Sequence, residues 1–296
     1  MPAPSEPKHV SILSEIYPPK SKWSSDEVPD LTGQTIIVTG GNSGIGKETC
    51  RILLSKNARI YMAARSEGKA RPAIEEITKS TGKTQLFFLK LDLADLPAVR
   101  KAAEEFLSKE EYLHVLGVMT PPMDDVTAQG YDSQFGTNVL GHFFFTTLLL
   151  PVLLRTAASS TNPTHKARIV NVSSNAHELM TVPGGINWDS LRKGEAATPA
   201  RRKLGKNALY GQSKLGDVLF SNELARRYGN QGIVSNSLNP GGVRTELQRH
   251  VNNPIARLII SALVYDVSYG VLTQLYLGTA PEALEMNGQV RKHAIS

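Results

Sequence analysis

A tyrosine and a lysine four residues apart form the most reactive pair in this sequence, Tyr210 and Lys214. Residues with this spacing lie on one face of a helix, so the lysine ammonium can lie near the phenol. A nearby cation favours the phenolate and lowers a tyrosine pKa from about 10 toward working pH, where the side chain can exchange a proton with an alcohol or carbonyl. The same spacing also fits an exposed helix face with no chemical role.

Two adjacent hydroxyl groups, at Ser173 and Ser174, follow the largely apolar segment 169–172. The run is typical of a buried strand, and a serine at the end of such a strand can donate a hydrogen bond to a substrate oxygen. Ordinary turn chemistry is the alternative interpretation of the pair.

A glycine-rich loop, Thr39–Gly46, lies between an apolar strand at 34–38 and a segment with helical apolar spacing. Glycines at this junction let backbone N–H groups approach an anion at the positive end of the helix, which indicates a phosphate site formed by Gly40, Gly44, Ile45 and Gly46. A tight strand-to-helix turn without a ligand is the alternative.

Basic residues follow the second expected strand. Arg65 occupies the place where NAD-binding sites usually carry an acidic residue, and an arginine there favours the 2′-phosphate of NADP, with Lys69 as a helper. Asp92, after the third expected strand, is a candidate acceptor for the adenine amino group. Arg65 could equally be a solvated surface residue, and Asp92 could instead cap a turn.

The elements that must position these residues alternate between strand-like and helix-like segments from Thr35 onward. Strands are expected at 34–38, 58–64, 85–91, 113–116, 168–173 and 232–238, and helices at 67–80, 97–109, 132–155 and 208–228. The alternation predicts an α/β fold with a doubly wound parallel sheet of Rossmann type, three layers in a single domain. We expect an N-terminal arm at 1–32 and a dinucleotide-binding domain at 33–296.

Composition excludes several classes of function. The chain has 296 residues, a formal charge of +6 and one cysteine, Cys50, so a disulfide framework is excluded and a reducing, cytoplasmic setting is favoured. The longest apolar run, about 12 residues near 143–154, is short for a membrane span. The basic residues are mostly scattered, so no nucleic-acid partner is expected; one cluster lies at 192–206 in a loop-like stretch.

Five ordered motifs make the chain resemble the short-chain dehydrogenase/reductase family, and most closely its retinol-dehydrogenase-like branch, over roughly residues 33 to 288. They are the loop Thr39–Gly46, Asn138 in Asn-Val-Leu-Gly, Ser174, the Tyr210/Lys214 pair, and Asn239–Thr245. The resemblance implies that Tyr210 is the general acid or base, that Ser174 orients the substrate oxygen, and that Asn138 maintains a proton relay through water.

The same resemblance implies that Lys214 lowers the tyrosine pKa and, with Tyr210, holds the nicotinamide ribose. Val243 and Thr245 would line the nicotinamide carboxamide and the diphosphate of NADP. A segment of about 35 residues between Ser174 and Tyr210, at about 175–207, would help cover a substrate pocket. With the apolar residues at 247–263 it predicts a hydrophobic alcohol or carbonyl as substrate. The oligomeric state stays open between a monomer and a homodimer formed through the helices carrying Asn138 and Tyr210.

Two features depart from the family pattern. The fourth expected strand, Leu113–Leu116, runs directly into Gly117. The segment Asn-Asn-Ala-Gly that usually ends this strand in the family is missing, so the chain is about four residues shorter here. The chain also ends soon after Gly288, which predicts a stunted seventh strand. These departures leave a second hypothesis open, a catalytically impaired cofactor-binding homologue of the same fold, and a third, a chain that folds poorly.

Overall fold

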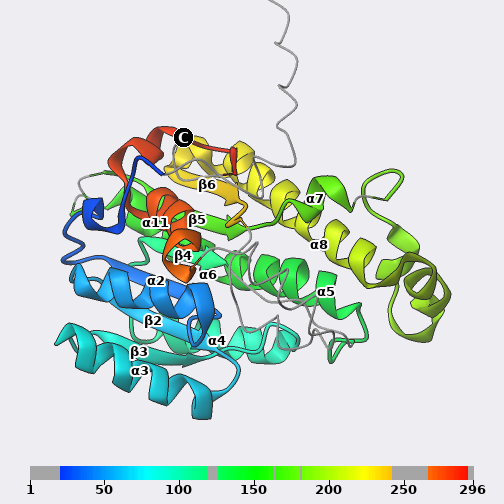
Figure 1. Ribbon diagram of the computed structural model, residues 1–296, viewed down its shortest axis with the longest axis horizontal. Coiled ribbons are helices and arrows are strands. Elements are labelled where there is room, and N and C mark those ends of the chain that lie inside the picture. The colour runs from blue at the N-terminus through cyan, green and yellow to red at the C-terminus, as the bar shows by residue number, and fades with distance from the viewer. Residues whose placement is uncertain are drawn as a thin grey trace, which may run out of the picture.

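The structure is a computed structural model that describes residues 21–118, 126–159, 161–162, 164–180, 182–241 and 266–292. Its centre is a seven-stranded sheet in the order β3-β2-β1-β4-β5-β6-β7, and every neighbouring pair is parallel. Strand order reverses between β1 and β4, which places a ligand site at the carboxyl ends of these strands. The expected doubly wound Rossmann-type sheet is confirmed (Figure 1).

The strands follow the apolar, β-branched runs of the sequence. Their bounds are β1 Thr35–Thr39, β2 Arg59–Ala64, β3 Leu86–Lys90, β4 Val115–Val118, β5 Ala167–Val172, β6 Ile233–Leu238 and β7 Val290–Arg291. β1, β5 and β6 are buried at every position, as expected for parallel strands covered on both faces. The seventh strand is short, as predicted.

The helices begin and end near the expected positions, with one exception described below. They are α2 Gly44–Ser55, α3 Glu67–Thr81, α4 Leu96–Leu107, α5 Ser133–Phe135, α6 His142–Ala158, α7 Ala176–Leu179, α8 Thr198–Tyr228, α10 Val267–Gly270 and α11 Leu272–Thr279. A π-helical turn, Gly136–Gly141, joins α5 to α6. Short 3-10 turns lie at Ser25–Glu27, Trp188–Leu191, Gly194–Ala197, Gly229–Gln231 and Pro281–Glu285.

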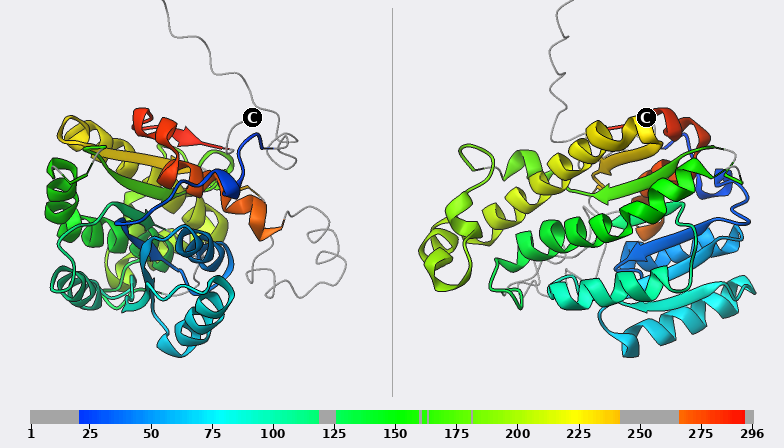
Figure 2. Two further views of the ribbon diagram at one scale, coloured as in Figure 1. Left: turned by 90° about the vertical axis from the view of Figure 1, so that its left-hand side faces the viewer. Right: turned by 180° about the vertical axis from the view of Figure 1, so that it is seen from behind.

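The helices cover both faces of the sheet, giving three layers (Figure 2). One apolar cluster packs α2, α3 and α11 on one face, and a second packs α4, α6 and part of α8 on the other. The described part of the predicted arm contributes Trp23, Val28 and Leu31 to the first cluster, where the Trp23 ring meets Tyr276 edge to face at 5.6 Å. The arm from residue 21 onward is therefore tied to the core.

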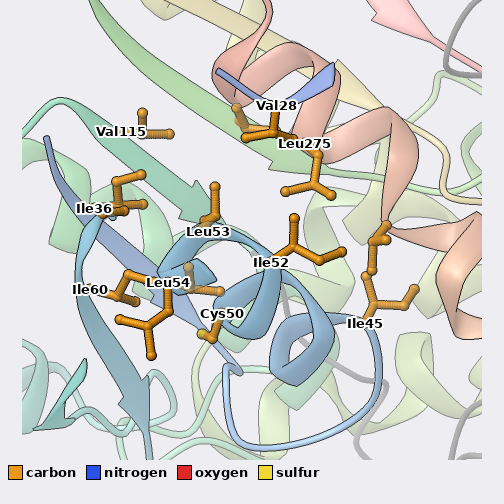
Figure 3. Packing of buried hydrophobic residues seen from close by; sticks show 14 of the residues in the cluster. Val28, Ile36, Ile45, Cys50, Ile52, Leu53, Leu54, Ile60, Val115 and Leu275 are labelled. Atoms are coloured by element: carbon orange, nitrogen blue, oxygen red, sulfur yellow. The ribbon is translucent and has the colours of Figure 1, made fainter. Parts of the chain in front are cut away.

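Helix α2 buries the apolar stripe expected behind the glycine loop. Ile45, Cys50, Leu53 and Leu54 are all buried, and Figure 3 shows Cys50 and Leu54 beside Ile60 of β2. Burial raises the pKa of the Cys50 thiol, so this cysteine is a packing residue with little thiolate at working pH.

Strand β4 differs from its prediction and leaves a gap in the packing. It spans Val115–Val118 rather than ending at Leu116, and pairs with β1 only as far as Gly117 opposite Val38. Gly117 lies on the same face as Val115, toward α2 and α11, and borders an apolar cavity of about 30 Å³. The strand includes Gly117, which has no side chain to fill the space between the sheet and helices α2 and α11.

Helix α8 corrects the prediction of a loop from 175 to 207. It begins at Thr198 with Pro199 in its first turn, and Gly205, at φ 72°, breaks it into two helical parts. Proline is well tolerated in a first helical turn, so the Gly/Pro content that indicated a loop is compatible with this helix. The remainder of the predicted loop contains α7 and two 3-10 turns, and in Figure 1 this segment and the start of α8 extend beyond the sheet.

The helical stretch Ser133–Ala158 is longer than the apolar run expected from the sequence. Among the described residues it alone is long and apolar enough to cross a membrane, with 26 residues and a mean hydropathy of 1.6 over its most apolar 18-residue window. Within the fold, 56% of its most apolar window is buried, and Phe145, Leu149 and Leu153 belong to the cluster on the sheet. Packing against β strands therefore accounts for its composition.

Candidate active site

Ser173 and Ser174, which follow β5, have different surroundings. Ser173 is buried, and its Oγ donates to the Lys214 carbonyl at 2.8 Å. Ser174 is only partly buried; its Oγ donates to Asn175 Oδ1 at 3.2 Å and accepts from the Ala176 N–H at 3.2 Å. The Ser173 hydroxyl is thus committed to the backbone of α8, whereas Ser174 lies at the open edge of the sheet.

Lys214 reaches from α8 to the end of β5. Its Nζ donates to the Val172 carbonyl at 2.9 Å and to Asp217 Oδ2 at 2.9 Å, and both ionic side chains are only 3% exposed. The ammonium lies 5.8 Å from the centre of the Tyr210 ring. Burial lowers the pKa of Lys214, but Asp217 and Tyr210 outweigh it and the net direction is upward. The lysine beside Tyr210 is therefore held as a cation.

Asn138 lies in the π-helical turn before α6 and is buried. Its Nδ2 donates to Ser213 Oγ at 2.9 Å, and Ser213 in turn donates to the Tyr210 carbonyl at 2.8 Å. Asn138 Oδ1 has no hydrogen-bond partner among the described residues. Single π turns often occur at functional sites, because the extra residue re-aims a side chain.

His142, one helical turn after Asn138, joins this cluster to the glycine loop. A carbonyl oxygen can only accept, so Nδ1 carries the proton it donates to the Asn138 carbonyl at 2.9 Å. Nε2 then accepts from the Thr39 hydroxyl at 3.1 Å, at the end of β1. Burial lowers the pKa of His142 to about 3, so the ring stays neutral. A hydrogen-bonded chain therefore runs from Thr39 through His142 and Asn138 to the helix of Tyr210.

The glycine loop has the shape that an anion cradle requires. Gly40 and Gly44 adopt φ of 63° and 50°, a region that favours glycine. A Cβ at Gly46 would lie 2.4 Å from the Gly40 carbonyl oxygen, and one at Gly41 would lie 3.0 Å from Cys50 Sγ. The loop is thus packed too closely for a side chain at Gly41 and Gly46, and the backbone from Gly40 through Gly44 and Ile45 to Gly46 fits a dinucleotide diphosphate.

The candidate residues for cofactor selectivity lie on the neighbouring strands. Arg65 immediately follows β2 and Lys69 lies in the first turns of α3; both are exposed, and Arg65 forms no ion pair within the described part of the chain. Asp92 is half-buried, and its Oδ1 accepts from the Ala94 N–H at 3.0 Å, which is the turn-capping contact. One oxygen of the Asp92 carboxylate therefore caps the turn.

Several predicted residues lie outside the described ones. Val243, Thr245 and the apolar stretch 247–263 are among them, as is the segment 119–125 after β4. At the carboxyl edge of the sheet, Asn138 bonds to Ser213 on α8, and Lys214 on the same helix bonds to Val172 and Ser173, the residues directly before Ser174. It leaves the contacts of Val243 and Thr245 as predictions.

Two residues in this cluster were missed by the sequence analysis, His142 and Asp217. His142 follows Asn138 by four residues and Asp217 follows Lys214 by three, so each shares a helix face with a predicted site residue. That spacing was the available signal, although only the tertiary structure shows that the face is buried.

Comparisons with known proteins agree with this architecture. The family profile described as short chain dehydrogenase matches residues 34–189. A short-chain dehydrogenase/reductase of Armillaria gallica is 53% identical over 283 residues, covering 94% of this chain and 87% of the relative. Retinol dehydrogenase 12 of Homo sapiens is 40% identical over 261 residues, covering 86% of this chain and 76% of that protein.

Solved structures show the same fold at low identity. The RhlG/NADP complex of Pseudomonas aeruginosa superimposes with a TM-score of 0.66 at 24% identity, covering 90% of this chain and 96% of that chain. L-sorbose reductase of Gluconobacter frateurii, complexed with NADPH and L-sorbose, gives a TM-score of 0.65 at 16% identity, covering 88% and 96%.

Proposed function

Because the chain belongs to the short-chain dehydrogenase/reductase family, we propose that it is an NADP-dependent oxidoreductase acting on a hydrophobic alcohol or carbonyl. The observation that carries the proposal is the hydrogen bonding of the segment that carries Tyr210 and Lys214 to Asn138 and to the end of β5, directly before Ser174. When bound, the nicotinamide supplies or accepts the hydride, and the protein supplies position, charge and a proton.

In the reducing direction, Tyr210 donates its phenolic proton to the substrate oxygen, and in the oxidising direction it accepts that proton. Ser174 Oγ donates a hydrogen bond to the same oxygen and fixes its position. The Lys214 cation beside the Tyr210 ring stabilises negative charge on the phenol oxygen while its proton is transferred. Asn138, tied to Ser213, holds the turn that faces this helix and supports the proton relay.

The glycine loop and Arg65 support the choice of cofactor. The loop offers backbone N–H groups at the start of α2, and Gly46 permits the close approach of its two arms. The exposed guanidinium of Arg65 at the end of β2 suits a 2′-phosphate, to which arginine can donate two parallel hydrogen bonds. Lys69 adds a second positive charge on the following helix.

Exposed apolar side chains on the segment after Ser174 support the proposed substrate class. Leu179 and Met180, on and after α7, expose 51% and 38% of their surface. Apolar side chains on a segment that follows the site residue favour an apolar substrate. Retinal belongs in the test panel, since human relatives are named retinol dehydrogenases.

Turnover of a carbonyl panel with NADPH tests the proposal. Reduction of at least one hydrophobic carbonyl is expected, and Tyr210→Phe should lower kcat by about 100-fold or more. Tyr112→Phe, a change next to the amino end of β4, is the matched control and should leave kcat unchanged. Equal rates for Tyr210→Phe and the unaltered protein would contradict the proposed role of Tyr210.

The shortened β4 favours one second candidate, a cofactor-binding protein without turnover. The cavity beside Gly117 shows that the sheet is incompletely packed next to the site. Thermal stabilisation by NADPH together with no turnover of any carbonyl in the panel would support this candidate. Turnover of a carbonyl would exclude it.

A further inference from the structure

The Lys214 ammonium has a buried anionic partner, Asp217. The two lie three residues apart on α8 and face the end of β5, and their charged atoms are 2.9 Å apart at 3% exposure on each side. Lys214 Nζ is therefore held by two acceptors, the Val172 carbonyl and the Asp217 carboxylate, while the Tyr210 ring lies on its third side.

A buried ion pair of this kind contributes little to the stability of the folded state. Moving two charges out of water costs several kcal/mol per ion, and an apolar pair of similar volume would often stabilise a fold as well or better. The described neighbours of Asp217 donate no second bond to the carboxylate atom that faces Lys214. A contribution to stability alone therefore does not explain why this ion pair is buried here.

We propose that Asp217 is a positioning residue that keeps Lys214 charged and fixed beside Tyr210. The inference rests on the proposed function, in which that cation stabilises the phenol oxygen during proton transfer. It adds one carboxylate to the set Asn138, Ser174, Tyr210 and Lys214, and the carboxylate acts through the lysine without touching substrate.

The electrostatics of the cluster agree with this role. Burial raises the pKa of Asp217 to about 6, although Lys214 draws it downward. Below this pH the carboxyl becomes neutral and the ammonium loses its counter-charge. The Lys214 charge also interacts with Tyr210 on α8 and with His142 on α6, and burial keeps His142 neutral with a pKa of about 3. Activity should consequently decline as the pH falls through about 6.

Asp217→Asn tests the charge alone, because the amide oxygen can still accept from Lys214 Nζ. We expect kcat at neutral pH to fall about 10-fold or more and the decline near pH 6 to disappear, with little change in the KM for the carbonyl. Asp189→Asn, which removes an exposed carboxylate paired with Arg192, is the matched control and should change neither quantity. An unchanged kcat with the same decline would overturn the proposal.

A second measurement separates this inference from the proposed function. In protein labelled with [13C]lysine, the ε-carbon signal of Lys214, assigned with Lys214→Met, reports the charge of the amine whether or not the protein turns over. Asp217→Asn should deprotonate Lys214 at a lower pH than in the unaltered protein, because burial then acts without a counter-charge. Asp217→Ser serves if the asparagine variant does not fold. A Lys214 signal that titrates identically in variant and parent would overturn the inference even if carbonyl turnover is observed.

Discussion

The glycine-loop end of the site is formed by backbone, whereas the Lys214 end is formed by polar side chains. At the loop, residues 39–46, specificity lies in backbone shape, and a Cβ at Gly46 would meet the Gly40 carbonyl at 2.4 Å. At the other end, a cluster of buried polar side chains on α6 and α8 is joined by hydrogen bonds, next to a strand that leaves a cavity. A side chain would therefore have opposite effects at the two ends. It would collide with the backbone at Gly46, whereas at Gly117 the nearest atom to an added Cβ would be 3.5 Å away.

The difference indicates how the fold tolerates its shortened strand. The loop end depends on β1, β2 and α2. Strands β1 and β2 pair along their whole length, from Thr35 opposite Arg59 to Thr39 opposite Ala63. The short strand β4 lies outside those contacts, on the side where the nicotinamide is proposed to lie. Cofactor binding and proton transfer should therefore respond to different substitutions.

The largest effect is expected at Gly46, the last glycine of the loop. Gly46→Ala forces a Cβ onto backbone atoms that cannot move cheaply, so we expect NADPH affinity to fall by about 100-fold and stability by about 2 to 3 kcal/mol. Fluorescence titration and chemical denaturation measure the two quantities. Gly68→Ala, in α3 with open space around it, is the matched glycine control and should bind NADPH normally.

The next effect concerns the Lys214 end and its pH dependence. The folded-state pKa of Asp217, about 6, lies above the ordinary value of 3.8, so its contribution to stability is full below 3.8 and is lost as the pH rises to about 6. Relative to Asp217→Asn, the unaltered protein should lose unfolding free energy as the pH rises across this window. Denaturation at pH 4 and pH 7 checks the sign. A parallel pH dependence in both proteins would contradict it.

A smaller effect is expected at the cofactor-selecting arginine. Arg65→Ala removes a charge-assisted contact proposed for the 2′-phosphate, so NADPH affinity should fall about 10-fold or more while NADH affinity is unchanged. Arg71→Ala provides the control, since this exposed arginine on α3 pairs with Glu67. Equal losses for both cofactors would show that Arg65 does not read the phosphate.

The smallest effect is a gain. Gly117→Ala adds a methyl group into the cavity at ordinary contact distances, so we expect stabilisation of about 1 kcal/mol from burial and reduced chain entropy. Gly278→Ala on α11 reaches the same cavity, where its Cβ would lie 3.7 Å from Val115. A loss of stability in both variants would contradict the loose packing of this region.

Most of the sheet could be predicted because buried parallel strands and amphipathic helices leave strong patterns. Strand β1 and helix α3 begin within a residue of their expected positions, and the ordered motifs identified the family. The start of α8 could not be predicted, because Pro199 and Gly205 are typical loop residues in the local sequence. The contact that holds this segment is tertiary: Arg201 donates to the Ser190 carbonyl in a turn 11 residues earlier in the chain.

The candidate site shows where sequence reasoning stops. Tyr210, Lys214 and Ser174 were found because their spacing has a chemical meaning. The partners His142 and Asp217 required knowledge of burial, since an exposed histidine or an exposed Lys/Asp pair with the same spacing would have no such consequence. Gly117 likewise shows its cavity only when β1, β5 and α11 surround it.

Strand β4 also determines how the sheet should respond to mechanical load. Among the described strands it alone links the β1–β3 half to the β5–β7 half of the sheet, and its register with β1 runs only from Val115 to Gly117. Interstrand bonds share an applied force, so a short ladder ruptures before a longer one. When opposite halves of the protein are pulled apart in a single-molecule experiment, the internal sheet should tear first between β1 and β4.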